Sequence, residues 1–121
     1  MKKLLSLLCV AAMIFALAAC GGSQAPAAEA QVFNIGICQL VQHPALDLAT
    51  QGFKDALTEK LGDSVSFNEQ NASGDAATCA VICNQFVSDE VDLIMANATP
   101  ALLAAASATN VIPVLGTSIT D

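Results

Sequence analysis

Apolar positions along residues 32–115 follow two periods in turn. Short runs rich in β-branched and other apolar residues predict strands at residues 32–38, 65–71, 91–95 and 111–115. Between these runs, apolar residues recur every three or four positions and predict helices at residues 44–61, 73–87 and 99–109. The order β-α-β-α-β-α-β, with crossovers of helical length, predicts a parallel, doubly wound α/β sheet with helices on both faces.

The first predicted helix is marked at both ends. Pro44 suits the first helical position, where its missing N–H costs nothing, and Gly62 suits the position just after the helix. The apolar face is expected to contain Leu46, Ala49, Phe53, Leu57 and Leu61. The residues expected to point away from that face are Asp47, Gln51, Asp55 and Glu59.

The other two helices begin with polar signals. Ser73 and Gly74 are expected to open the second helix, with Asp75 in its first turn, where a negative charge suits the helix dipole. Thr99 is expected to cap the third helix directly before Pro100. The inner face of the second helix is predicted to contain Cys79, Ile82, Cys83, Phe86 and Val87.

The predicted strand ends are the natural place for a ligand, because such sheets bind ligands outside the carboxyl ends of their strands. These ends are loops rich in small polar residues, at residues 39–43, 71–73, 97–99 and 117–121. His43 is the only histidine of the chain and lies at the first of these corners. We expect it either to contact a ligand or to cap or pack at the corner.

The first twenty residues predict an export signal. Lys2 and Lys3 precede an uncharged apolar run that ends at residue 19, shorter than the ~20 residues that a spanning helix needs. The sequence LAAC at residues 17–20 resembles a bacterial lipobox, which predicts lipidation of Cys20 and anchoring to the outer face of the cell membrane. The alternative is a cleaved signal with an incidental cysteine. Residues 21–31 predict a flexible tether, so the folded part is residues 32–121.

Charge and cysteine content narrow the function classes further. After residue 20 the only basic residues are Lys54 and Lys60, against eleven acidic residues in the chain, so nucleic acid is excluded as a partner. Cysteines 79 and 83 are four positions apart on one predicted helix, a spacing that disfavours a disulfide between them. Together with Cys38, they are expected to be buried free thiols.

Binding is better supported than catalysis. The sequence has no nucleophile elbow, no phosphate-binding loop and no dinucleotide fingerprint, so we expect no enzyme activity, no metal and no cofactor. Helix starts at Pro44 and Pro100 would aim free backbone N–H groups at the strand ends, where a small anion such as a carboxylate is stabilised. Thr99 and Thr117 offer hydroxyls there, and Asp121 offers a carboxylate for an ammonium group.

Several motifs occur in an order that resembles a known family. The segments IGICQLVQHPALDLATQGFKDAL, NASGD, FVSDEVDLIMANATPA and VIPVLGTSITD resemble the substrate-binding lipoproteins of ABC transporters for tryptophan and tyrosine uptake. The resemblance implies a type I periplasmic-binding-protein fold, in which two α/β lobes joined by a hinge close on a small ligand. It also implies an amino acid as ligand, with an aromatic one suggested by the family, and a membrane permease as partner.

The resemblance places a set of residues at the ligand cleft. These residues are Gln39, His43, Asn97, Thr99, Thr117 and Asp121. Family members have two lobes, so residues 32–121 are expected to be an incomplete N-terminal lobe. The chain has no Trp and no Tyr to stack on an aromatic ligand. Three alternatives therefore stay open: a sugar or nucleoside receptor of the same fold, a flavodoxin-like lipoprotein enzyme, and a surface or adaptor lipoprotein that binds no solute.

Overall fold

The computed structural model describes residues 29–120. The predicted export signal, Cys20, most of the predicted tether and Asp121 therefore lie outside the described residues. Within residues 29–120, no helix is both long and apolar enough to span a membrane.

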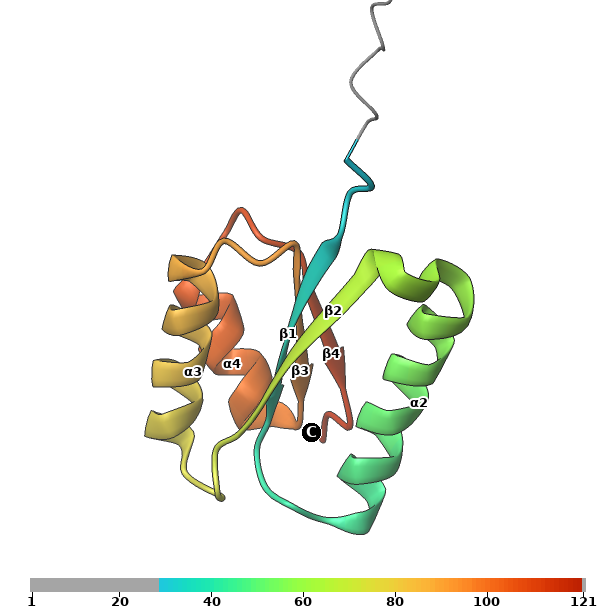
Figure 1. The fold of residues 1–121 in the computed structure, drawn as a ribbon. Coiled ribbons are helices and arrows are strands. Elements are labelled where there is room, and N and C mark those ends of the chain that lie inside the picture. Colours follow the sequence, from blue (N-terminus) through green and yellow to red (C-terminus); the bar gives the residue numbers. More distant parts are fainter. Residues whose placement is uncertain (1–28, 121) are drawn as a thin grey trace, which may run out of the picture.

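A four-stranded parallel sheet forms the centre of the fold (Figure 1). The elements follow the chain as β1 (Phe33–Gln39), α2 (Pro44–Leu61), a short 3₁₀ turn η1 (Gly62–Ser64), β2 (Val65–Asn71), α3 (Ala76–Ser88), β3 (Leu93–Asn97), α4 (Thr99–Ala108) and β4 (Val114–Thr117). The strand order is β2-β1-β3-β4, and every pair is parallel. Helix α2 covers one face of the sheet, and α3 and α4 cover the other. The predicted α/β fold is confirmed.

Each face of the sheet has its own apolar core. On the α2 face, Ile35, Ile37 and Met95 are buried and pack with partly buried side chains that include Phe53 and Phe67. The predicted apolar face of α2 is confirmed in position, although these side chains are half-buried and the fully buried residue of the helix is Thr50. The opposite core is larger and joins α3 and α4 to the sheet. Its fully buried members include Cys38, Cys79, Cys83, Phe86, Ile94, Ala96, Ala101 and Ala105.

One close approach of β1 to α3 explains the glycine in the first strand. A Cβ atom on Gly36 would lie 2.7 Å from the ring of Phe86, which is fully buried. Only a residue without a side chain lets the ring pack directly on the strand.

The third and fourth strands begin later than the sequence pattern predicted. Val91 is buried, but its N–H bonds to the Phe86 carbonyl, so it belongs to the turn that follows α3 and not to β3. Before β4, the hydroxyl of Thr109 accepts hydrogen bonds from the N–H groups of Val111 and Ile112 at 3.1 Å. The backbone N–H groups of these residues therefore bond within local turns, although apolar composition alone had assigned the residues to strands.

Two helix starts also differ from the prediction. Asp75 is the N-cap of α3 rather than a residue of its first turn, and its carboxylate accepts from the N–H groups of Ala77 and Thr78. Thr99 does not cap α4, because Ala98 occupies the N-cap position and no side chain caps that helix. The C-terminal stop of α2 at Gly62, with φ of 54°, is confirmed.

The three described cysteines are buried free thiols, as predicted. A hydrogen bond to the Cys83 thiol and burial raise the pKa of Cys38, and burial raises the pKa of Cys79. Both thiols therefore stay protonated and act as small apolar groups. No group of three or more His, Cys, Asp or Glu in residues 29–120 is arranged to hold a metal ion.

Candidate functional site at the strand ends

The last residues of the four strands form one polar row across the sheet. In sheet order they are Asn71, Gln39, Asn97 and Thr117, and the strand pairing places each directly beside the next. Residues in register on neighbouring parallel strands project to the same face. Hydrogen bonds from Gln39 and Asn97 to α2 identify that face as the one that α2 covers. The sheet therefore brings together three predicted site residues, Gln39, Asn97 and Thr117.

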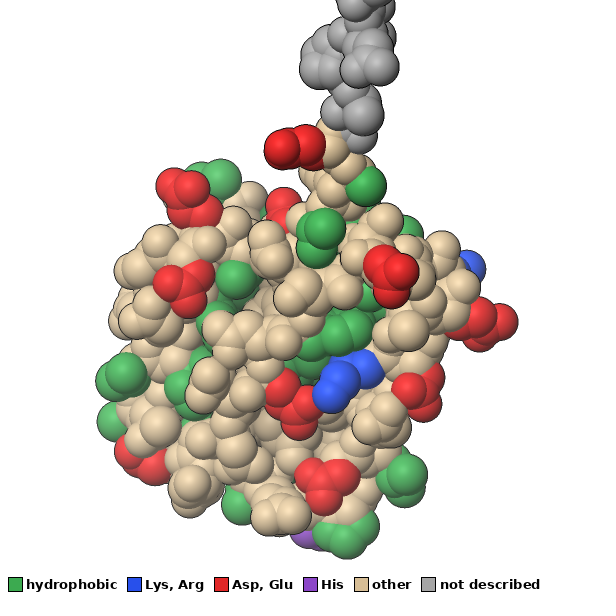
Figure 2. Space-filling view, in the orientation of Figure 1, with side chains coloured by type: hydrophobic (Ala, Val, Ile, Leu, Met, Phe, Trp, Pro, Cys, Tyr) green, Lys and Arg blue, Asp and Glu red, His purple; other side chains and the backbone are tan. Residues whose placement is uncertain are grey.

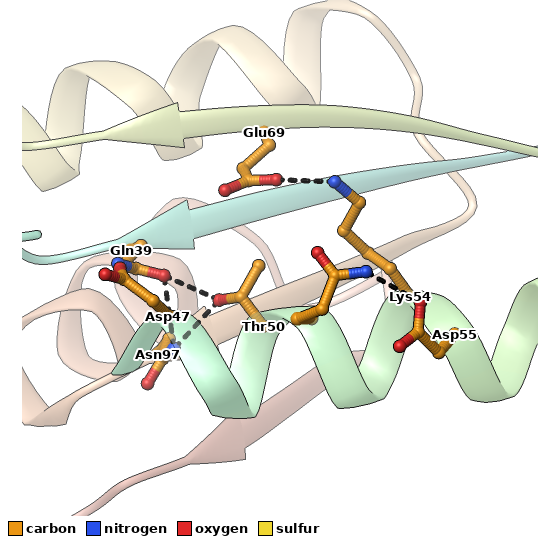
Figure 3. A network of polar contacts seen from close by, with 8 residues as sticks. Gln39, Asp47, Thr50, Lys54, Asp55, Glu69 and Asn97 are labelled. Atoms are coloured by element: carbon orange, nitrogen blue, oxygen red, sulfur yellow. Dashed lines mark hydrogen bonds and ion pairs between the residues drawn. The ribbon is translucent and has the colours of Figure 1, made fainter. Parts of the chain in front are cut away.

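Gln39 is held by hydrogen bonds at both ends of its amide (Figure 3). Its Nε2 donates to Asp47 Oδ1 at 2.6 Å and to the Val41 carbonyl at 2.9 Å. Its Oε1 accepts from the Thr50 hydroxyl at 2.6 Å. The side chain is only 3% exposed, so these bonds fix the end of β1 to the first two turns of α2.

Asn97 is fully buried and is bound through its nitrogen. Its Nδ2 donates to the Leu46 carbonyl at 2.8 Å and to Thr50 Oγ1 at 2.9 Å, and lies 3.5 Å from Gln39 Oε1. The amide cannot be turned over, because the Leu46 carbonyl is an acceptor and would then face an oxygen.

Asn97 Oδ1 is a buried acceptor without a hydrogen-bond donor. In Figure 3 this oxygen points away from Gln39 and Thr50. A buried polar atom without a partner costs about 1–3 kcal/mol, and such atoms are uncommon in native structures. The strand ends therefore contain an acceptor that a donor from outside the described residues would satisfy.

His43 caps α2. Its Nδ1 accepts a hydrogen bond from the Ala45 N–H at 3.2 Å, and its extended backbone is that of an N-cap residue. The capping role considered from the sequence is therefore confirmed. The side chain is exposed, and the other ring nitrogen is free of hydrogen bonds within the described residues.

Thr99 lies at the start of α4 and joins two strand-end loops. Its hydroxyl donates to the Thr120 carbonyl at 3.1 Å and accepts from the Thr120 N–H at the same distance. The Ala98 N–H bonds to the Thr117 carbonyl at 2.9 Å. The segments after β3 and β4 are thus tied together, directly beside the uncapped start of α4.

Backbone strain gathers at the same edge of the sheet. Four non-glycine residues of the described chain have positive φ, and three of them, Ser73, Ala98 and Ser118, follow the ends of β2, β3 and β4. Ala98 has φ of 97° and ψ of 157°, a region that glycine occupies almost alone. Strained residues of this kind cluster at binding sites, where the surrounding structure holds them.

The strand-end segments contain one acidic residue, Asp121, and no lysine or arginine. Asp75 is committed to capping α3, and hydrogen bonds from the Thr78 hydroxyl and the Ala77 and Thr78 N–H groups lower its pKa. Lys54 pairs with Glu69 at 2.9 Å, and on the face shown in Figure 2 the basic side chains lie away from the lower edge, where the strands end. A carboxylate at this edge would therefore be held by backbone N–H groups rather than by a basic side chain.

Two hollows lie near this edge. A cavity of about 220 Å³ between α2 and β4 is lined by apolar side chains and, at its strand-end side, by Thr117. A groove of about 440 Å³ follows the seam between α3 and α4, from Ala76 and Pro100 to Ala108. The smaller cavity adjoins the polar row, whereas the groove lies on the opposite side of the sheet.

Sequence reasoning missed two members of the polar network. Asp47 was assigned to the exposed side of α2, but it is half-buried and accepts from Gln39. Thr50 was assigned to neither face. Its spacing gave a signal, since it lies one helical turn from both Leu46 and Phe53 on the predicted apolar face. Predicted site residue Asp121 lies outside the described residues.

Comparison with known proteins identifies the family of this chain. Residues 34–121 match the family model described as ABC transporter substrate binding protein. A protein of Clostridioides difficile (strain R20291) named "Tyrosine-binding protein" is 48% identical over 91 residues, which are 73% of this chain and 26% of that relative.

Solved structures from three bacteria resemble the chain. A ligand-free, open substrate-binding protein with adhesive properties from Clostridium difficile is 44% identical, with a TM-score of 0.71 over 74% of this chain and 32% of that one. A conserved domain protein from Vibrio cholerae is 36% identical, with a TM-score of 0.72 over 75% and 32%. An ABC domain in complex with L-Trp from Streptococcus pneumonia is 39% identical, with a TM-score of 0.70 over the same shares. The chain thus spans about a quarter to a third of these relatives.

Proposed function

The chain belongs to the family of ABC transporter substrate-binding proteins, and on that basis we propose that it binds an amino acid, most favourably an aromatic one, at its strand ends. The solute lies against the polar row and is released to a permease in the membrane. No chemistry is performed on it. The relatives named above as binding tyrosine and L-Trp support the choice of ligand class.

The observation that carries this proposal is the convergence of unused hydrogen-bonding groups at one edge. Asn97 Oδ1 is a buried acceptor that lacks a donor, and it suits an ammonium or another N–H group. Beside it, α4 begins without a side-chain cap, so the N–H groups of its first turn suit a carboxylate. An α-amino acid carries both charged groups on the same carbon atom, which is the complement of this pair of groups.

The aromatic ring of the solute must find its stacking partner outside residues 29–120. Phe53 and Phe67 pack edge to face at 6.5 Å within the core on the α2 face. Phe86 is fully buried on the other face. We therefore assign the ring contact to a second lobe, which closes over the strand ends and excludes water. In this account residues 32–121 contribute one wall of the cleft.

We also propose an anchor for this receptor. Residues 1–20 serve as a lipoprotein signal, Cys20 is lipidated, and residues 21–31 tether the lobe to the outer face of the cell membrane. The acidic composition supports this arrangement, because a surface with few bases is repelled by anionic lipid and benefits from a covalent attachment.

The test is isothermal titration calorimetry on the protein as its complete gene encodes it. We expect saturable binding of L-tyrosine or L-tryptophan, weaker binding of L-phenylalanine, and much weaker binding of L-leucine. Ribose and adenosine serve as controls for the alternative of a sugar or nucleoside receptor. Binding of either control with no binding of any amino acid would overturn the proposal, and so would a lack of binding by the whole panel.

A further inference from the structure

Thr50 is a buried hydroxyl on α2 that contacts two residues of the polar row at once. It is 3% exposed. Its Oγ1 donates to Gln39 Oε1 at 2.6 Å and accepts from Asn97 Nδ2 at 2.9 Å. Figure 3 shows the hydroxyl between the two amides, which come from neighbouring strands.

This arrangement decides how both amides are oriented. A threonine hydroxyl has one proton to donate, and here the proton goes to Gln39 Oε1. The same oxygen can then only accept from Asn97, so Asn97 must face it with its nitrogen. The Leu46 carbonyl, which accepts from the same nitrogen at 2.8 Å, enforces the same orientation. The consequence is that Asn97 Oδ1 points away from the network and lacks a donor.

We propose that Thr50 is a positioning residue for solute binding: its hydroxyl holds Gln39 and Asn97 so that Asn97 Oδ1 is kept as the acceptor for an N–H or O–H donor of the solute. This inference rests on the proposed function and adds to it a residue inside the helix that does not itself touch the solute. The buried, unpartnered oxygen is the independent sign that a donor belongs at this position.

The test compares two variants that differ in the hydroxyl. Thr50→Val keeps the shape of the side chain but cannot donate or accept, so Gln39 and Asn97 each lose a partner and the Asn97 amide is held mainly by the Leu46 carbonyl. Thr50→Ser keeps the hydroxyl. By calorimetry with L-tyrosine and L-tryptophan, we expect Thr50→Val to weaken binding of the preferred solute by about tenfold and Thr50→Ser to stay within about threefold of the wild type.

A matched control separates positioning from general loss of stability. Ile82→Val removes one methylene from the core on the α3 side of the sheet, far from the polar network. It should lower the thermal midpoint by an amount comparable to that of Thr50→Val, while solute affinity measured well below either midpoint stays unchanged. If Thr50→Val and Ile82→Val have the same affinity as the wild type, the inference is overturned while the proposed function stands.

A measurement on the wild type covers the case in which Thr50→Val does not fold. The side-chain NH₂ signals of Asn97 in ¹⁵N-labelled protein should shift on saturation with the preferred solute, whereas those of the exposed Asn84 on α3 should not. Unchanged Asn97 signals in a protein that binds the solute would overturn the inference. If no solute binds the wild type at all, the proposed function fails first, and this inference fails with it.

Discussion

His43 lies at the strand-end edge of the sheet and is also the N-cap of α2. Its Nδ1 accepts from the Ala45 N–H, a task usually performed by Ser, Thr, Asp or Asn. Pro44 follows at the first helical position and needs no acceptor for an N–H group. The imidazole thereby fixes the direction in which α2 leaves the strand-end edge, and its second nitrogen stays on the exposed side of the corner.

Replacing the cap separates its structural role from any contact with a solute. We expect His43→Ala to lower the free energy of unfolding by about 1 kcal/mol, because a cap is lost, and His43→Asn to retain most of that stability. Urea unfolding followed by circular dichroism measures both. Equal stability of His43→Ala and the wild type would contradict the capping role. A loss of solute affinity in His43→Asn without a loss of stability would assign the ring to the site.

At the residue scale, the sequence predicted positions better than partners. Gln39 and Asn97 were named from the family resemblance and fall in segments predicted to follow two of the strands, and the structure places them in contact. Their partner Thr50 was missed, because a single threonine among the apolar residues of a helix carries no motif. Thr99 was predicted to cap α4, but its hydroxyl bonds to Thr120 instead. The sequence did not reveal this bond, because it depends on how two distant loops meet.

At the scale of elements, the sheet depends on how closely α3 approaches β1. Gly36 lies in the middle of β1, directly under the Phe86 ring of α3. Three residues further along the same strand, Gln39 enters the polar network. Strand β1 therefore contacts the Phe86 ring on one face of the sheet and the polar network on the other.

The surroundings of Gly36 and Gly52 predict opposite changes in stability when each is replaced by alanine. Gly36→Ala places a methyl group 2.7 Å from a buried ring, and we expect it to destabilise the protein by about 1–3 kcal/mol or more. Gly52→Ala, at a position in α2 where a Cβ meets nothing within 4 Å, should stabilise it by about 0.5–1 kcal/mol. Urea unfolding measures both. A Gly36→Ala variant as stable as the wild type would show that the ring does not pack against the strand in this way.

The Asp75 cap of α3 predicts that the free energy of unfolding depends on pH. The pKa of Asp75 is lowered in the folded state, so its charged form is stabilised by folding. That contribution is present above the unfolded pKa, near 4, and is lost as the pH falls through the lower folded value. An asparagine at this position would cap without titrating, so the stability difference between the wild type and Asp75→Asn should shrink between about pH 6 and pH 3. A difference that does not vary with pH contradicts this account.

Element order was fully predictable, whereas element boundaries were not. Periodicity predicted four strands and three helices in the observed order. The starts of β3 and β4 were wrong because hydrogen bonds that apolar composition cannot reveal, such as those to the Thr109 hydroxyl, hold the preceding residues in turns. The start of α2 was right because Pro44 restricts its own backbone.

At the scale of the whole molecule, the described chain is a layered lobe with its polar, strained edge on one side. Figure 1 shows that the N-terminal segment enters β1 at the end of the sheet opposite to the strand-end edge. A tether attached there would leave the strand-end edge free to face a second lobe. This geometry agrees with a receptor held to a membrane at one end and open to solute at the other.

The anchor itself can be tested in bacterial cells that produce the protein. We expect the wild type to incorporate an alkyne-labelled fatty acid and to sediment with membranes, and Cys20→Ser to lose both properties, since acylation requires the thiol. Cys9→Ser, within the apolar part of the predicted signal, is the matched control and should keep the label. An unlabelled wild-type protein would favour a cleaved signal with an incidental cysteine.

The most direct test of the central claim is to map the solute on the protein by amide NMR. The complete protein, labelled with ¹⁵N, would be titrated with L-tyrosine and with L-tryptophan. We predict that the largest shifts within residues 29–120 fall at residues 39–43, 71–73, 97–99 and 117–120. Shifts that gather instead along the groove between α3 and α4, or that avoid residues 29–120 while binding occurs, would contradict the account.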